Sequence, residues 1–122
     1  AHLTLTAYGY MAHLAMDAML RLAYQHEVFC ELLVPTQLAP FELAPLIASL
    51  QNTQHLLAIE EGTLPLGWGA EVLARSAEAL GAGLIKAGRL AAQGEVVPAA
   101  GDLEAACLPD VDDIIQKVRE MV

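Results

Sequence analysis

The chain has 122 residues, a length that suits a single domain over residues 1–122. Hydrophobic residues make up 56% of the chain and charged residues 17%, and this composition excludes a disordered protein. The net charge of −9, with only six scattered Lys and Arg residues, argues against nucleic acid or anionic membranes as partners and favours a basic protein. No apolar run approaches the roughly 20 residues of a membrane span, and Cys30 and Cys107 show no metal or redox spacing, which predicts reduced thiols.

Strand-like and helix-like patterns alternate along the chain. Apolar runs predict strands over residues 3–7, 27–34, 55–61 and 83–91. Helical spacing of apolar residues predicts helices over residues 11–25, 41–51, 67–80 and 110–122. The run at 27–34 is almost continuously apolar, which is typical of a strand covered on both faces. The alternation predicts an α/β fold in which helices cover a parallel sheet.

Several residues predict where the helices begin or end. Pro45 fits the first turn of the second helix, because a proline there loses no hydrogen bond. Gly81 is expected to end the third helix, and Asp110 to cap the start of the fourth. On the first helix, Asp17 precedes Arg21 by four residues, which predicts a solvated, salt-bridged face.

The stretch HLLAIEEGTLPLGWGAEV, residues 55–72, is the main candidate for a functional site. Its Gly67-Trp68-Gly69 segment looks like part of the dinucleotide fingerprint G-x-G-x-x-G, but Val72 stands where the third glycine belongs. The gap from strand end to helix start is also longer than the tight turn of that motif. Two carboxylates at the strand end would repel a pyrophosphate. The sequence therefore argues against a dinucleotide site.

Those carboxylates, Glu60 and Glu61, have two further interpretations. As an acid/base pair they would have to share a proton, yet adjacent strand residues point to opposite faces and no His or Lys lies close in sequence. The favoured interpretation is structural: the carboxylates accept hydrogen bonds from loop amides and from helix N-termini, while Gly62 and the later glycines let the backbone pack closely. Trp68 is then expected to anchor a subunit contact.

The remaining polar residues form no recognisable site. The histidines lack metal-ligand spacing, and the serines lack a G-x-S-x-G nucleophile motif. The residues concerned are His2, His13, His26, His55, Ser49 and Ser76. The sequence therefore predicts no catalytic, cofactor-binding or metal-binding residue in this chain.

Taken in order, three segments resemble a known family. LTLTAYGYMAHLAMDA resembles the "strand, YG, helix" opening of the transketolase C-terminal domain, in the version found in the beta subunit of the decarboxylating component of 2-oxo acid dehydrogenase complexes. HLLAIEEGTLPLGWGAEV is similar to that family's "strand, EEG, GxGAE" stretch. LEAACLPDVDDIIQKV looks like its closing "LE…LP…DI" segment. The resemblance covers essentially the whole chain.

The resemblance implies a three-layer α/β domain with a mostly parallel five-stranded sheet, one antiparallel edge strand and helices on both faces. In such enzymes thiamine diphosphate and magnesium lie between two other domains, so this chain would hold neither and would be inactive alone. Its implied role is to contact other subunits, including a second copy of itself, and to dock the acyltransferase core of the complex. The implied compartment is the cytoplasm of a bacterial-type cell, or the mitochondrial matrix in a eukaryote.

Two departures from the family pattern leave details open. Val34-Pro35-Thr36-Gln37 stands where the family reads D-L-R-T, which leaves the subfamily and the oxo acid undecided. Gly81 lies near where some members carry a docking aspartate, so docking would have to use other acids. The candidates, which equally suit a capped and solvated helix start, are Asp110, Asp112, Asp113 and Glu120.

Two alternatives to the dehydrogenase role remain. One keeps the fold within a transketolase or a deoxyxylulose-phosphate synthase, although the LEAACLPDVDDII ending disfavours both. The other is a stand-alone interaction module with no enzyme attached.

Overall fold

The computed structural model describes residues 1–35, 42–63, 67–92 and 109–122. Its strands are β1 (Leu3–Ala7), β2 (Cys30–Leu33), β3 (His55–Thr63) and β4 (Lys86–Ala92). Its helices are α1 (Tyr10–His26), α2 (Ala44–Thr53), α3 (Trp68–Leu80) and α5 (Val111–Met121), and a short 3-10 helix, Gly81–Gly83, follows α3. Within this part of the chain, no helix combines the length and apolarity that crossing a membrane demands.

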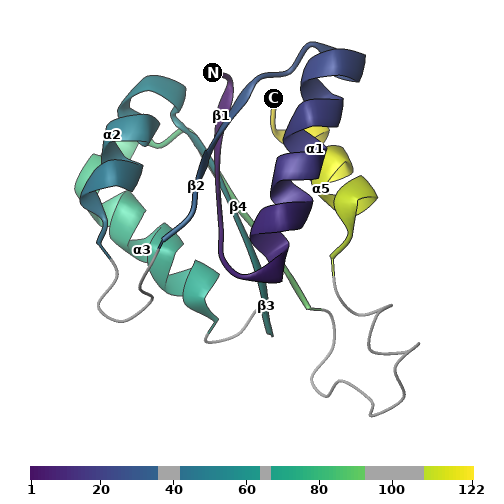
Figure 1. Cartoon of the computed structure of the whole chain (residues 1–122). Coiled ribbons are helices and arrows are strands. Elements are labelled where there is room, and N and C mark those ends of the chain that lie inside the picture. The colour runs from purple at the N-terminus through teal and green to yellow at the C-terminus, as the bar shows by residue number, and fades with distance from the viewer. Residues whose placement is uncertain (36–41, 64–66, 93–108) are drawn as a thin grey trace.

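The strands form one parallel sheet in the order β2-β1-β3-β4 (Figure 1). Leu5 of β1 lies between Leu32 of β2 and Leu57 of β3, which fixes the register at the centre. The α/β class with a parallel, helix-covered sheet is therefore confirmed. The described residues contain four strands, all parallel. The antiparallel fifth strand is not among them. The sequence between the fourth expected strand and the last helix, residues 92–109, predicts mostly loop, and most of it lies outside the described residues.

The strand expected over residues 27–34 differs from the prediction in two respects. The observed β2 covers only Cys30–Leu33, and it lies at the edge of the described sheet. Its residues are half-buried or exposed, because β1 pairs with one side of it and no described strand pairs with the other. Both faces of β2 nevertheless meet a helix, because Cys30 and Leu32 pack on the core under α1 and Leu33 packs on the core under α2. The strand is therefore covered on both faces, as expected, but less completely than a central strand, and an apolar run alone does not distinguish the two.

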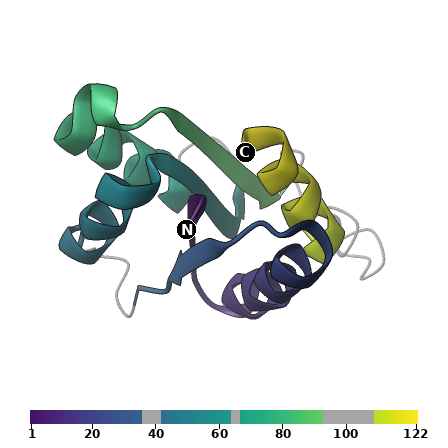
Figure 2. The same ribbon diagram turned by 90° about the horizontal axis from the view of Figure 1, so that it is seen from above.

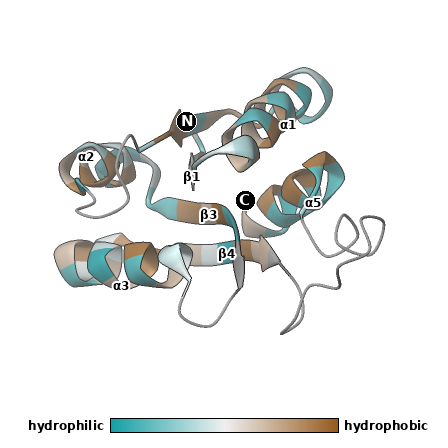
Figure 3. Ribbon diagram, turned by 60° about the horizontal axis from the view of Figure 1, so that its bottom comes forward, coloured by the Kyte–Doolittle hydropathy of each residue, from teal (hydrophilic) through white to brown (hydrophobic). Residues whose placement is uncertain are grey.

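Helices α1 and α5 cover one face of the sheet, and α2 and α3 cover the other (Figure 2). Side chains alternate along each strand, so Leu57 and Ile59 point to the α1/α5 face while Leu56 packs with α2 and α3. Figure 3 shows hydrophilic and hydrophobic residues on each of the four helices. The domain thus has two hydrophobic cores separated by the sheet.

The helix boundaries follow the local signals in the sequence. Pro45 lies in the first turn of α2, and Gly81 ends α3 with a φ of 54°, a conformation that costs glycine little. Asp110 caps α5 through a reciprocal pair of hydrogen bonds with Asp113. On the solvent side of α1, Arg21 Nε lies 3.5 Å from Asp17 Oδ1, as the spacing predicts.

A cluster of buried hydroxyls, which the sequence did not reveal, joins α2 to β1. Thr4 Oγ1 lies 2.8 Å from Ser49 Oγ and 2.6 Å from Thr53 Oγ1. All three residues are buried. Hydrogen bonding between them satisfies polar groups that would otherwise destabilise the core.

Candidate functional site at the carboxyl edge of the sheet

The sheet order places a switch point between β1 and β3. The chain runs outward from β1 to β2 on one side and from β3 to β4 on the other. In open α/β sheets, ligands bind in the crevice at the carboxyl ends of the strands that flank such a point. Tyr8 follows β1, Glu60 and Glu61 lie near the end of β3, and α3 begins just beyond. The fold therefore brings the candidate stretch to the place where a ligand site is expected.

The Glu60 side chain fills the inner part of this crevice. Glu60 is 1% exposed, and its Oε1 accepts a hydrogen bond of 2.8 Å from the backbone amide of Gly69. Gly69 belongs to the first turn of α3, where free amides and the helix dipole stabilise a negative charge. The second oxygen, Oε2, is buried and finds no hydrogen-bond partner among the described residues. The carboxylate thus occupies the position at which a helix N-terminus would receive an anionic ligand.

The neighbouring Glu61 is in a different environment. It is exposed, whereas Glu60 is buried, as the alternation of strand side chains requires. The pair therefore cannot share a proton across a common pocket. One carboxylate is part of the core and the other faces solvent.

Gly69 is required because the Glu60 carboxylate approaches it so closely. A Cβ atom there would lie 2.9 Å from Glu60 Oε1, 3.3 Å from Arg89 Cδ and 3.4 Å from Ala58 Cβ. Gly69, the second glycine of the segment that resembles a dinucleotide motif, thus makes room for the Glu60 side chain of the same chain. Gly67, the first, is the N-cap of α3 with extended backbone angles.

Tyr8 and Trp68 pack against each other beside Glu60. Their ring centroids lie 5.0 Å apart and the ring planes meet at 83°, an edge-to-face contact. Burial raises the pKa of the Tyr8 phenol, and the charges of Glu60 and Glu61 raise it further. The phenol therefore stays protonated at neutral pH. Trp68 is half-buried, so part of its ring is available for a contact outside the chain.

The described residues of the crevice do not fit thiamine diphosphate and magnesium. A diphosphate needs hydrogen-bond donors and positive charge, but the Gly69 amide is already bonded to the Glu60 carboxylate, which would repel a diphosphate at this point. Magnesium would need several accessible oxygen ligands, whereas Glu60 is buried. Within the described residues, no group of three or more His, Cys, Asp and Glu side chains could hold a metal ion.

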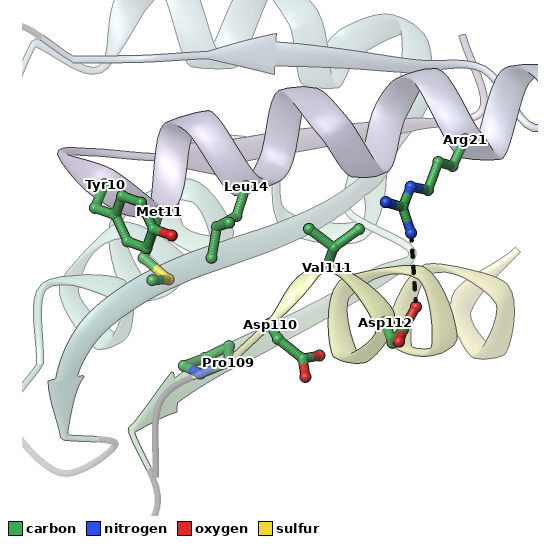
Figure 4. A pocket seen from close by; sticks show the side chains of 8 residues that line it. All are labelled: Tyr10, Met11, Leu14, Arg21, Pro109, Asp110, Val111 and Asp112. Carbon is green, nitrogen blue, oxygen red and sulfur yellow. Dashed lines mark ion pairs between the residues drawn. The ribbon is translucent and has the colours of Figure 1, made fainter. Parts of the chain in front are cut away.

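The acidic residues of α5 lie on the opposite face of the sheet. Asp110 Oδ1 accepts from the Asp113 amide at 2.8 Å, and Asp113 Oδ2 accepts from the Asp110 amide at 3.0 Å. These two carboxylates are therefore engaged in capping the helix. Asp112 Oδ1 lies 4.0 Å from Arg21 Nη1 across a groove of about 410 Å³ between α1 and the start of α5 (Figure 4). Glu120 is exposed near the end of the helix.

The other residues considered from the sequence are dispersed. His2 accepts a hydrogen bond from the Phe29 amide through Nδ1, and the His55 ring bonds the Thr53 carbonyl. Cys30 is a free thiol whose pKa burial raises to about 11, so it is protonated and unreactive at neutral pH. Cys107 lies outside the described residues.

The fold defines a class: a three-layer α/β domain built on a parallel sheet of order 2-1-3-4. The family model for the transketolase C-terminal domain matches residues 1–114, and the chain belongs to this family. The recognition made from the three sequence segments is therefore confirmed.

Curated relatives and a solved structure agree with this assignment. The chain is 28% identical over 121 residues to the mitochondrial pyruvate dehydrogenase E1 component subunit beta of Rattus norvegicus, covering 98% of this chain and 33% of that protein. It is 32% identical over 95 residues to the Homo sapiens subunit, covering 76% of this chain and 26% of that protein. The chain thus spans about a third of the relatives' length. A structure described as a split gene transketolase, inactive beta4 tetramer, superposes with a TM-score of 0.81 at 18% identity, covering 98% of this chain and 37% of that chain.

Sequence reasoning missed two features of the site. The first is Tyr8, which received no role from the sequence, although an aromatic residue directly after a strand is a signal for a side chain at the carboxyl edge. The second was Arg89, whose aliphatic stem packs at the same point as Glu60; it lies on β4, and only the strand order brings it there. No local pattern could have revealed that contact.

Proposed function

We propose that this chain is the assembly and subunit-contact domain of a thiamine-diphosphate-dependent 2-oxo acid dehydrogenase, and that residues 1–122 form a single domain. The complete enzyme would decarboxylate pyruvate or a branched-chain 2-oxo acid and transfer the acyl group to a lipoyl arm. Membership of the transketolase C-terminal family and the names of the curated relatives support this role. The same proposal implies a cytoplasmic location, or the mitochondrial matrix in a eukaryote.

The observation that carries the proposal is the buried Glu60 carboxylate. It is bonded to the Gly69 amide and fills the place where the fold would otherwise bind an anion. A domain that closes this crevice with its own side chain is suited to a structural role. Thiamine diphosphate and magnesium would then be held by other domains of the enzyme, and this chain would contribute no catalytic residue.

The outer part of the carboxyl edge is the proposed contact surface. Glu61 is exposed and Trp68 is half-buried, so both can meet a neighbouring domain or subunit. Gly67 is the N-cap of α3, directly before Trp68, and Gly62 lies in β3 just after the two acids. A partner with basic and apolar side chains would complement this edge, because aromatic anchors at the centre of interfaces carry much of their binding energy.

Docking of the acyltransferase core at α5 is the finer part of the proposal. Asp110 and Asp113 are engaged in the capping box, so Asp112 and Glu120 are the residues better placed to meet a basic partner. Asparagine substitution at Asp112 together with glutamine substitution at Glu120 is expected to weaken binding to the core. Asp110→Asn, which can still cap the helix, serves as the control. Equal loss of binding in both would count against a specific docking role.

Titration calorimetry of the 122-residue chain with thiamine diphosphate and magnesium tests the main proposal. We expect no binding heat at cofactor concentrations up to about 1 mM. A dissociation constant above about 1 mM means a binding free energy weaker than about −4 kcal/mol. Micromolar binding would contradict the structural role of the crevice.

A transketolase is the second candidate enzyme, favoured by the superposition on the split gene transketolase chain. The sequence encoded beside this chain separates the two. The dehydrogenase assignment predicts a partner gene for a lipoyl-bearing acyltransferase, and the transketolase assignment predicts none.

A further inference from the structure

We propose that the start of α3 holds a guanidinium-binding site, in which an arginine side chain of a basic protein partner lies against Trp68 and pairs with Glu71. This inference rests on the proposed contact role of the carboxyl edge and deepens it by naming the chemical group that the edge recognises. It depends on a surface hollow, on the aromatic ring in that hollow, and on carboxylates that form no ion pair with a described residue.

The hollow has a volume of about 490 Å³ and lies at the first turn of α3. The residues that line it are Gly67, Trp68, Ala70 and Glu71. Trp68 and Glu71 are three residues apart, so their side chains lie on the same side of the helix. Gly67 and Ala70 have little or no side chain and leave space beside them. A group seated in the hollow therefore meets an aromatic ring and a carboxylate at the same time.

The charge around the hollow is negative. Glu61 and Glu71 are exposed, and neither forms an ion pair with a described Lys or Arg residue. The dipole of α3 places about half a positive charge at this end of the helix. The Glu60 carboxylate already offsets that charge through its bond to the Gly69 amide, and its second oxygen has no hydrogen-bond partner among the described residues. The carboxylates therefore outweigh the helix dipole, and the hollow attracts a cation.

A guanidinium fits this arrangement better than other cations do. It is planar and always charged, it stacks on aromatic rings, and its fork of donors matches a carboxylate. A lysine ammonium is instead a compact, strongly hydrated charge. The pKa of the Tyr8 phenol, which packs on Trp68, is raised by burial and then by the charges of Glu60 and Glu61, so the carboxylates act on the aromatic pair. The net charge of −9 makes a basic protein the matching source of the arginine.

Nuclear magnetic resonance can follow binding through the indole N–H signal of Trp68, because Trp68 is the only tryptophan of the chain. The probe is Nα-acetyl-arginine amide, added to the chain at low salt. We expect it to shift the indole signal with a dissociation constant on the order of 10 mM, since one cation–π contact and one exposed ion pair bind weakly. The matching citrulline amide, which is neutral, should leave the signal unchanged. The lysine amide should bind at least about threefold more weakly.

Glu71→Gln tests the carboxylate while keeping the size of the side chain. It should raise the dissociation constant of the arginine amide at least about threefold. Glu78→Gln removes the same charge from an exposed position about two turns further along α3 and should leave the constant unchanged. Three results would each overturn the proposal: no shift up to about 100 mM arginine amide, an equal shift with the citrulline or lysine amide, or equal constants for the two variants. None of them would alter the cofactor titration, which tests the proposed assembly role separately.

Discussion

Replacing Gly69 with alanine tests whether close packing holds the Glu60 side chain in place. The added Cβ would lie 2.9 Å from Glu60 Oε1 and 3.3 Å from Arg89 Cδ, closer than ordinary van der Waals contact allows. Glu60 is buried on all sides and cannot move into solvent. The substitution must therefore either displace the carboxylate or shift the first turn of α3.

The expected free-energy change combines three effects. Alanine in a helix is favourable by about 0.5–1 kcal/mol relative to glycine. Overpacking a rigid site costs about 1–3 kcal/mol, and weakening a hydrogen bond to a charged group costs about 1.5–3 kcal/mol. Because the two costs overlap, we expect Gly69→Ala to lower the free energy of unfolding by about 2–4 kcal/mol.

Urea unfolding followed by far-ultraviolet circular dichroism measures this change. Gly83→Ala is the matched control, because the nearest atom to its added Cβ is Leu80 Cβ at 3.9 Å, an ordinary contact. We expect the control to differ from the wild-type chain by less than about 0.5 kcal/mol. If Gly69→Ala were as stable as the wild-type chain or more so, the tight packing of Glu60 against α3 would be refuted.

Three further changes test other parts of the structure. Thr4→Val removes the centre of the buried hydroxyl cluster and should lower the free energy of unfolding by about 1–3 kcal/mol. Ser76→Ala removes a buried hydroxyl that has no hydrogen-bond partner among the described residues, so it should be neutral or stabilising. Urea denaturation of the two variants measures the difference. In a chain whose other cysteine is replaced by serine, the rate at which Cys30 reacts with iodoacetamide should keep rising with pH up to about 11, because only the thiolate is reactive. A rate that stops rising below about pH 9, near the ordinary thiol pKa, would contradict the burial of Cys30. Asp110→Ala should destabilise the chain by about 1 kcal/mol through loss of the capping box, while Asp112→Ala should change thermal stability little.

The layers and helix boundaries could be predicted because local chemistry decides them. Pro45, Gly81 and Asp110 each fix a helix end through their own backbone or side-chain preferences. The buried face of α1 follows from the spacing of Met11, Ala15 and their neighbours. These features depend on residues within one or two turns of each other, so the sequence contains the information directly.

Other features depend on strand order, which no local pattern specifies. β2 lies at the edge of the described sheet and is only partly buried, although helices pack on both of its faces; its apolar composition did not indicate the edge position. The structural interpretation of the two glutamates predicted hydrogen bonds to helix amides. It did not predict which carboxylate would be buried, because strand alternation fixes their opposite orientation but not which face is covered.

The most direct test of the central claim is the unfolding free energy of Glu60→Ala, measured with and without thiamine diphosphate and magnesium. If Glu60 is a structural side chain, its removal leaves the Gly69 amide unpaired and opens a cavity, and we expect a loss of about 2–4 kcal/mol. That loss should be the same with or without the cofactor, while the exposed Glu61→Ala should change stability by less than about 0.5 kcal/mol. A Glu60→Ala chain of unchanged stability, or a cofactor that stabilises the wild-type chain but not the variant, would contradict the account.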